Sequence, residues 1–155
     1  MTDADRELLD HFRRTREKTI ELLACVPDEL LPRTPDGETQ PLYYLLAHAG
    51  SSGTHWWMHH VLNDGLEDHH RFPAEKDALL ADMQYWRDRV LAYFTAENGA
   101  NLGKTFHFDD EYGTRLEWTG RNRLLYFVDH EVHHRGKIVL ALRQWGVEGL
   151  PFFPF

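Results

Sequence analysis

The sequence contains very little cysteine, since Cys25 is the only one among 155 residues. A single thiol excludes an internal disulfide and any metal site built from several cysteines. Cys25 directly follows the apolar segment 22–24. We therefore expect its side chain to be a small buried hydrophobe and not a nucleophile.

Long apolar runs are also missing. No stretch approaches the roughly 20 apolar residues that a membrane-spanning helix needs, and the polar residues 1–18 do not resemble a signal peptide. We therefore expect a cytoplasmic protein that does not contact a membrane. The composition is nevertheless globular, with 42% hydrophobic and 27% charged residues. We expect residues 1–155 to form a single domain.

Positive charge is scarce as well, with 17 lysine and arginine residues against 25 acidic residues and a formal net charge of −8. Nucleic-acid binding depends largely on clustered basic side chains, so this balance disfavours it. The densest basic cluster consists of Arg13, Arg14 and Arg16, and acidic residues surround it on both sides. We interpret this cluster as a solvated helix face.

Four segments repeat apolar residues at helical spacing, and turn-forming prolines and glycines separate them. Before the last of these segments, two short alternating stretches flank DDEYGT and predict a two-stranded hairpin or an ordered loop. Four helices of this length predict an all-α four-helix bundle. The predicted helices span residues 4–25, 41–62, 74–96 and 120–145, and the hairpin or loop lies within 100–119.

Histidine, in contrast, is abundant, with eleven in the chain. His130 and His134 are four residues apart, which places both on one face of the last predicted helix. Two imidazoles at this spacing chelate a single metal ion well. His133 is rotated by about 100° from His134 and is expected to face solvent. On the second predicted helix, His48 borders the apolar face and is the histidine best placed to point inward.

For the other histidines, the sequence gives weaker evidence of metal binding. His55 and His59 lie on the second predicted helix and either line the same cavity as His48 or face solvent. The remaining ones are interpreted as surface or loop residues. They are His11, His60, His69, His70 and His107.

The segment HEVHH at 130–134 also fits the H-E-x-x-H pattern of zinc metalloproteases. A third histidine ligand downstream, as in metzincins, is missing, because no histidine follows His134. The pattern therefore does not support a protease. Glu131 is the one candidate for a catalytic base, and the alternative is that it supports a ligand histidine or is solvated. Asp129 is a candidate for orienting a ligand histidine.

Taken together, these features resemble the DinB/YfiT-like superfamily of metal-dependent four-helix-bundle proteins. The resemblance rests on LLAHAG at 45–50 and on HEVHHRGKIVLAL at 130–142, where Arg-Gly follows the second histidine of the pair. It implies that His48, His130 and His134 bind one divalent metal ion, zinc or nickel. It also implies an up-down-down-up helix path and a homodimer.

Members of this superfamily with known activity include thiol-dependent transferases and isomerases that act with mycothiol or bacillithiol. The resemblance thus implies a metal-dependent thiol transferase or hydrolase that acts on a small molecule, with a low-molecular-weight thiol as cosubstrate. Three imidazoles would leave a coordination position for water or substrate. Two alternatives stay open: a non-catalytic metal-holding protein that binds a ligand, and a dimeric scaffold that the metal only stabilises.

Overall fold

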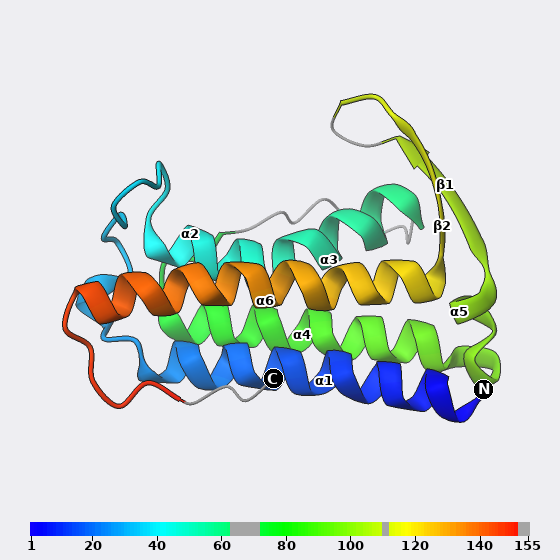
Figure 1. The fold of residues 1–155 in the computed structure, drawn as a ribbon, viewed down its shortest axis with the longest axis horizontal. Coiled ribbons are helices and arrows are strands. Elements are labelled where there is room, and N and C mark those ends of the chain that lie inside the picture. Colours follow the sequence, from blue (N-terminus) through cyan, green and yellow to red (C-terminus); the bar gives the residue numbers. More distant parts are fainter. Residues whose placement is uncertain (63–71, 110–111, 152–155) are drawn as a thin grey trace.

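Long helices lie side by side along the length of the molecule in the computed structural model, which describes residues 1–62, 72–109 and 112–151 (Figure 1). Three of these helices are regular, and the second consists of α-helical segments that alternate with π-helical turns. The regular helices are α1 (Asp3–Cys25), α4 (Lys76–Thr95) and α6 (Gly120–Gln144). The segments of the second helix are α2 (Leu42–Ala47), η2 (His48–Ser52), α3 (Gly53–Trp56) and η3 (Trp57–Val61).

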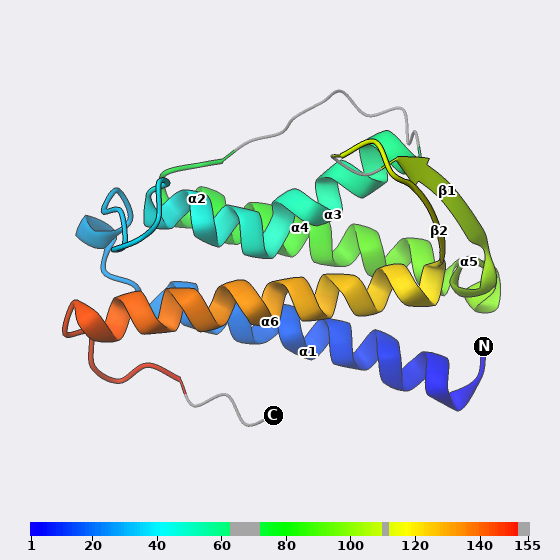
Figure 2. The same cartoon turned by 45° about the horizontal axis from the view of Figure 1, so that its top comes forward.

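The helices follow an up-down-down-up path. In both views, α2, α3 and α4 run in one direction along the bundle, whereas α1 and α6 run in the other (Figures 1 and 2). This arrangement confirms the predicted all-α bundle and its path. Within the described residues, no helix is both long and apolar enough to cross a membrane.

Two capping boxes define where α1 and α6 begin. The Thr2 hydroxyl accepts a hydrogen bond from the backbone N–H of Asp5, and the Asp5 carboxylate accepts one from the N–H of Thr2. Thr119 and Asn122 make the same reciprocal pair at the start of α6. These bonds satisfy backbone donors that have no partner within the helix.

The predicted hairpin is present and leads directly into α6. Strand β1 (Thr105–Asp109) pairs antiparallel with β2 (Arg115–Thr119), with Phe106 opposite Trp118 and Phe108 opposite Leu116. Phe106 and Phe108 are buried, so one face of the hairpin packs onto the end of the bundle. The short elements η1 (Asp28–Leu30), η4 (Ala96–Gly99) and α5 (Ala100–Gly103) lie in the connections.

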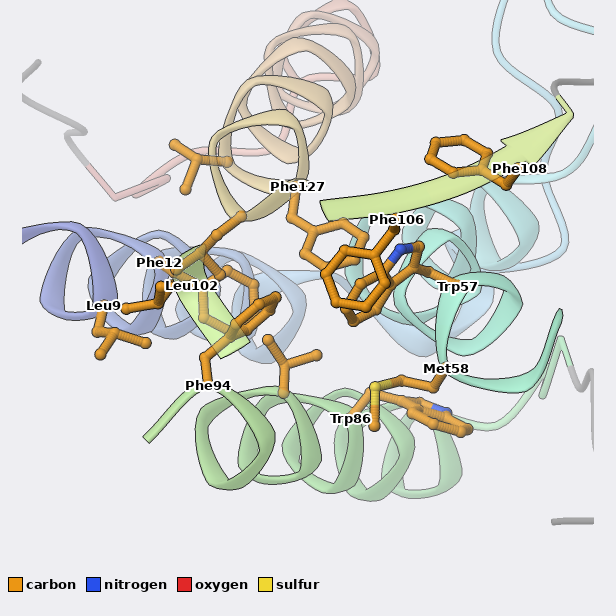
Figure 3. Packing of buried hydrophobic residues seen from close by; sticks show 13 residues of the cluster. Leu9, Phe12, Trp57, Met58, Trp86, Phe94, Leu102, Phe106, Phe108 and Phe127 are labelled. Carbon is orange, nitrogen blue, oxygen red and sulfur yellow. The ribbon is translucent and has the colours of Figure 1, made fainter. Parts of the chain in front are cut away.

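The core consists of two apolar clusters separated along the bundle axis. The cluster beneath the hairpin is aromatic and includes Phe12, Trp57, Phe94 and Phe127 (Figure 3). The cluster at the other end is mainly aliphatic. On α6, Leu124, Phe127 and Val128 belong to the first cluster, and Ile138 and Leu142 belong to the second. The histidine segment therefore lies between them.

Two expectations about burial are wrong. Cys25 is exposed at the last residue of α1, although Leu22, Leu23 and Val26 beside it are buried. Arg16 is fully buried, whereas Arg13 and Arg14 are exposed. Arg16 is buried because a carboxylate on α6 pairs with it, as described below.

Gly50 allows the second helix to pack closely on α4. A Cβ at Gly50 would lie 2.8 Å from side-chain atoms of the fully buried Met83, whereas a Cβ at Gly136 in α6 would meet no atom of a described residue within 4 Å.

We therefore predict that Gly50→Ala lowers the free energy of unfolding by about 1–3 kcal/mol through overpacking. Gly136→Ala should raise it by about 0.5–1 kcal/mol, because alanine favours the helix. Urea denaturation of both variants and the wild type measures this difference. Equal stability of the two variants would contradict the close packing at Gly50.

Candidate metal centre

Three histidines converge between the second helix and α6. His48 is the first residue of η2, and His130 and His134 lie one turn apart on α6. One ring nitrogen from each lies within 4.8 Å of the others, and the Nε2 atoms of His48 and His130 are 3.1 Å apart. The structure therefore brings together all three residues that the sequence predicted as metal ligands.

The spacing of these nitrogens fits one metal ion. Two nitrogens bound to a tetrahedral ion at about 2.0–2.1 Å stand about 3.3–3.4 Å apart. The shortest observed nitrogen–nitrogen distance is 3.1 Å and none exceeds 4.8 Å, so this separation lies within the observed range. Small rotations of the three side chains would bring the nitrogens to the distances that one bound ion requires. Three imidazoles would occupy three of four tetrahedral positions, which is the pattern of an open site.

Burial keeps His130 and His134 uncharged at pH 7. Burial, together with repulsion from His134 and His48, lowers the pKa of His130 to about 3. Burial likewise lowers the pKa of His134 to about 4, with a second contribution from His48. Neutral imidazoles at pH 7 have a free lone pair, which is the form that binds a metal.

A π-helical turn begins at His48. Turns of this kind occur frequently at functional sites. The side-chain hydroxyl of Ser51 donates to the carbonyl of Ala47, and that of Thr54 donates to the carbonyl of Ser51, so both hydroxyls are satisfied within the helix. A Cβ at Gly53 would lie 3.9 Å from the ring of His130, so the backbone approaches the site closely there.

Glu131 lies outside the histidine cluster. Both carboxylate oxygens accept hydrogen bonds from Nε of Arg16 on α1, at 3.1 and 3.0 Å, and both side chains are fully buried. Nη1 of Arg16 also donates to the carbonyl of Met83 on α4. These contacts favour a structural role for Glu131 over the predicted role of catalytic base, which stays a prediction.

Arg135 also faces α1. It donates to the carbonyl of Thr15 at 2.9 Å and to the hydroxyl of Thr19 at 3.3 Å. Burial lowers the pKa of Arg135, and the charge of Glu131 opposes that shift. Positions 131 and 135 thus anchor α6 to α1, while positions 130 and 134 present their imidazoles to the second helix.

The other predicted positions have simpler surroundings. His133 is exposed, and so is Asp129, whose carboxylate pairs with none of the described residues. His55 is buried, and its ring stacks on His59 at 5.8 Å and meets Trp86 edge-on at 4.9 Å. His11 and His107 are exposed, whereas His69, His70 and the side chain of His60 lie outside the described residues.

Sequence reasoning missed Arg123. It lies seven residues before His130 and therefore on the same face of α6, and it is buried among aromatic rings. The spacing of seven residues between Arg123 and His130 could have indicated that Arg123 shares the face of the histidines. An arginine on a helix rich in polar residues normally faces solvent, however.

The described arrangement is that of a four-helix bundle with one histidine from its second helix and an H-x-x-x-H pair from its last. The sequence profile of the DinB family matches residues 1–153, and the chain belongs to this family. No curated protein matches the chain.

Two solved structures share the fold. A DinB-like protein from Bacillus cereus ATCC 10987 superposes with a TM-score of 0.73 and 16% identity, covering 95% of each chain. A DinB-like protein, YjoA, from Bacillus subtilis gives a TM-score of 0.67 and 18% identity, covering 94% of this chain and 96% of the other.

The lowered pKa values predict how the stability of the metal-free protein depends on pH. In the unfolded chain, His130 and His134 have ordinary pKa values near 6.5, so they bind protons between pH 7 and 5 that the folded protein does not. Their contribution to stability is present above pH 6.5 and is lost as the pH falls toward the folded-state values.

We predict that urea denaturation shows a smaller loss of stability from pH 7 to pH 5 in His130→Phe than in the wild type. His133→Phe, which changes an exposed histidine, should keep the wild-type loss. Identical losses in all three proteins would contradict the buried, neutral state of His130.

Proposed function

We propose that the protein binds one divalent metal ion, zinc or nickel, through His48, His130 and His134, and that it is a metal-dependent thiol transferase or hydrolase acting on a small molecule. The observation that carries this proposal is the convergence of three imidazole nitrogens within 4.8 Å. A metal held there would acidify a bound thiol or water at its open position.

The residues around the site support a small organic substrate. The ring of Tyr126 stacks on His130 at a centroid distance of 5.7 Å, and the ring of Tyr44 is nearly parallel to that of His48 at 6.3 Å. Tyr126 is exposed, so the site borders solvent on this side. Aromatic walls with a few polar groups are typical of small-molecule sites.

The composition of the cluster favours thiol transfer over hydrolysis. The three-histidine cluster includes no carboxylate among the described residues, and Glu131 is paired with Arg16. Hydrolysis by a metal-bound water commonly uses a nearby base, whereas a metal-bound thiol needs only to lose its proton. We therefore propose a low-molecular-weight thiol as cosubstrate. We also propose that the protein acts as a homodimer.

The metal assignment predicts a defined stoichiometry. Tag-free protein should bind about one equivalent of zinc or nickel, and His48→Ala, His130→Ala and His134→Ala should each weaken binding by at least about 100-fold, because each removes one of three ligands. His133→Ala is the matched control and should bind normally. Isothermal titration with each metal measures the affinities. Equal losses in His133→Ala and in the other variants would overturn the ligand assignment.

The enzymatic assignment predicts metal-dependent turnover. In a screen of low-molecular-weight thiols against chromogenic electrophiles, the metal-loaded protein should catalyse conjugation, and chelation or His134→Ala should lower kcat/KM by at least about 100-fold. Circular dichroism checks that the variant is folded. Thiol binding without any product would instead support the non-catalytic ligand-binding alternative.

A further inference from the structure

Arg123 is a buried cation enclosed by aromatic side chains. It is only 5% exposed, and six rings from the second helix, the hairpin and α6 lie 4.6 to 6.0 Å from its Cζ. Figure 3 shows part of this enclosure, with Trp57 and Phe127 close together beneath β1. The six rings belong to Trp56, Trp57, Phe108, Trp118, Tyr126 and Phe127.

The hydrogen-bonding capacity of this guanidinium is largely unused. One donor, Nη2, reaches the carbonyl of Gly53 at 3.3 Å, and Nε is buried without a partner in the part of the chain that the structure describes. Within the described parts of the chain, no carboxylate pairs with Arg123. Burial lowers its pKa to about 10, so it remains charged at pH 7. A buried cation without an anion is costly. Cation–π contacts with the surrounding rings offset part of this cost but supply no hydrogen-bond acceptor in the plane of the guanidinium.

A second unpaired donor belongs to the same enclosure. The indole Nε1 of Trp57 is fully buried and has no hydrogen-bond partner among the described residues. The ring of Trp57 lies 6.0 Å from Cζ of Arg123. Buried N–H groups are nearly always paired in folded proteins. Two unpaired donors in one aromatic enclosure indicate a missing acceptor.

This enclosure adjoins the histidine site. Arg123 and His130 lie on one face of α6, separated by about 10.5 Å along the helix axis, and both border Gly53. Tyr126 connects them, since its ring stacks on His130 and lies 4.9 Å from Cζ of Arg123. The guanidinium and the ring of His130 are therefore both close to Gly53.

We propose that Arg123 and the indole N–H of Trp57 bind the carboxylate of the small-molecule substrate, while the three histidines hold the metal that binds its thiol end. The binding of the thiol end rests on the proposed function, because it requires the metal. The binding of the carboxylate by Arg123 and Trp57 does not. A single guanidinium matches the one negative charge of a carboxylate, and charge-assisted hydrogen bonds to it are strong. The substrate class is thus a thiol-containing organic acid.

The carboxylate subsite can be tested without metal. In the metal-free wild type, hexanoate should shift the NMR resonances of the Arg123 Nε–H and the Trp57 indole N–H, because both gain an acceptor. The neutral analogue 1-hexanol should leave the Arg123 resonance unchanged. If hexanoate shifts neither resonance, the subsite is overturned regardless of any result with metal.

The complete site is tested with bifunctional probes on the metal-loaded protein. The probes are mercaptoacetate, 3-mercaptopropionate and 6-mercaptohexanoate, each compared with the mercapto-alcohol of the same length. For at least one length the acid should bind about tenfold more tightly or better, since a hydrogen bond to a charged group contributes that much. Arg123→Met should abolish the preference and leave alcohol binding unchanged.

Arg143→Met is the matched control, because it removes the same charge from an exposed position near the end of α6, and it should keep the preference. If Arg123→Met does not fold, as judged by circular dichroism, Arg123→Lys provides the second variant and should weaken the preference. Acids and alcohols that bind equally through the metal would overturn the subsite but not the proposed function. Failure of every thiol to bind, with hexanoate still shifting Arg123, would overturn only the metal-bound end.

Discussion

The buried ion pair between Arg16 and Glu131 sets the rotation of α6 in the bundle. Its partners are fully buried, and Arg16 also reaches the backbone of α4, so one guanidinium connects three helices. Removing one partner of such a pair typically costs about 3–5 kcal/mol, because the other charge is then buried alone. Glu131 must therefore face α1, which leaves His130 and His134 facing the second helix.

The chemistry of the histidine site follows from this rotation. The two imidazoles on α6 enter a partly buried layer between an aromatic and an aliphatic cluster, where burial keeps them neutral and ready to bind a metal. The same burial acts differently on Arg123, which keeps its charge and lacks a counter-ion among the described residues. A site that combines neutral ligands with an uncompensated cation is suited to an anionic substrate.

Much of the fold could be predicted from the sequence, because helical periodicity and capping are local. The four helices end within about two residues of their expected limits, and the hairpin is where alternation indicated it. The three histidines were also accessible, since spacing of four residues determines a shared helix face. Burial of individual side chains was harder, as Cys25 and Arg16 show.

Sequence alone thus determined the bundle, the pairing of His130 with His134 and the inward placement of His48, because these depend on helical geometry and local polarity. Only the tertiary structure decided what Glu131 and Arg123 contact. Helical rotation places Glu131 about 60° from His134, an angle compatible with either neighbouring helix. Whether Glu131 faces α1 or the second helix depends on which of them offers a partner for its carboxylate. That partner is Arg16 on α1, which is 115 residues away in the chain and could not be identified from local sequence.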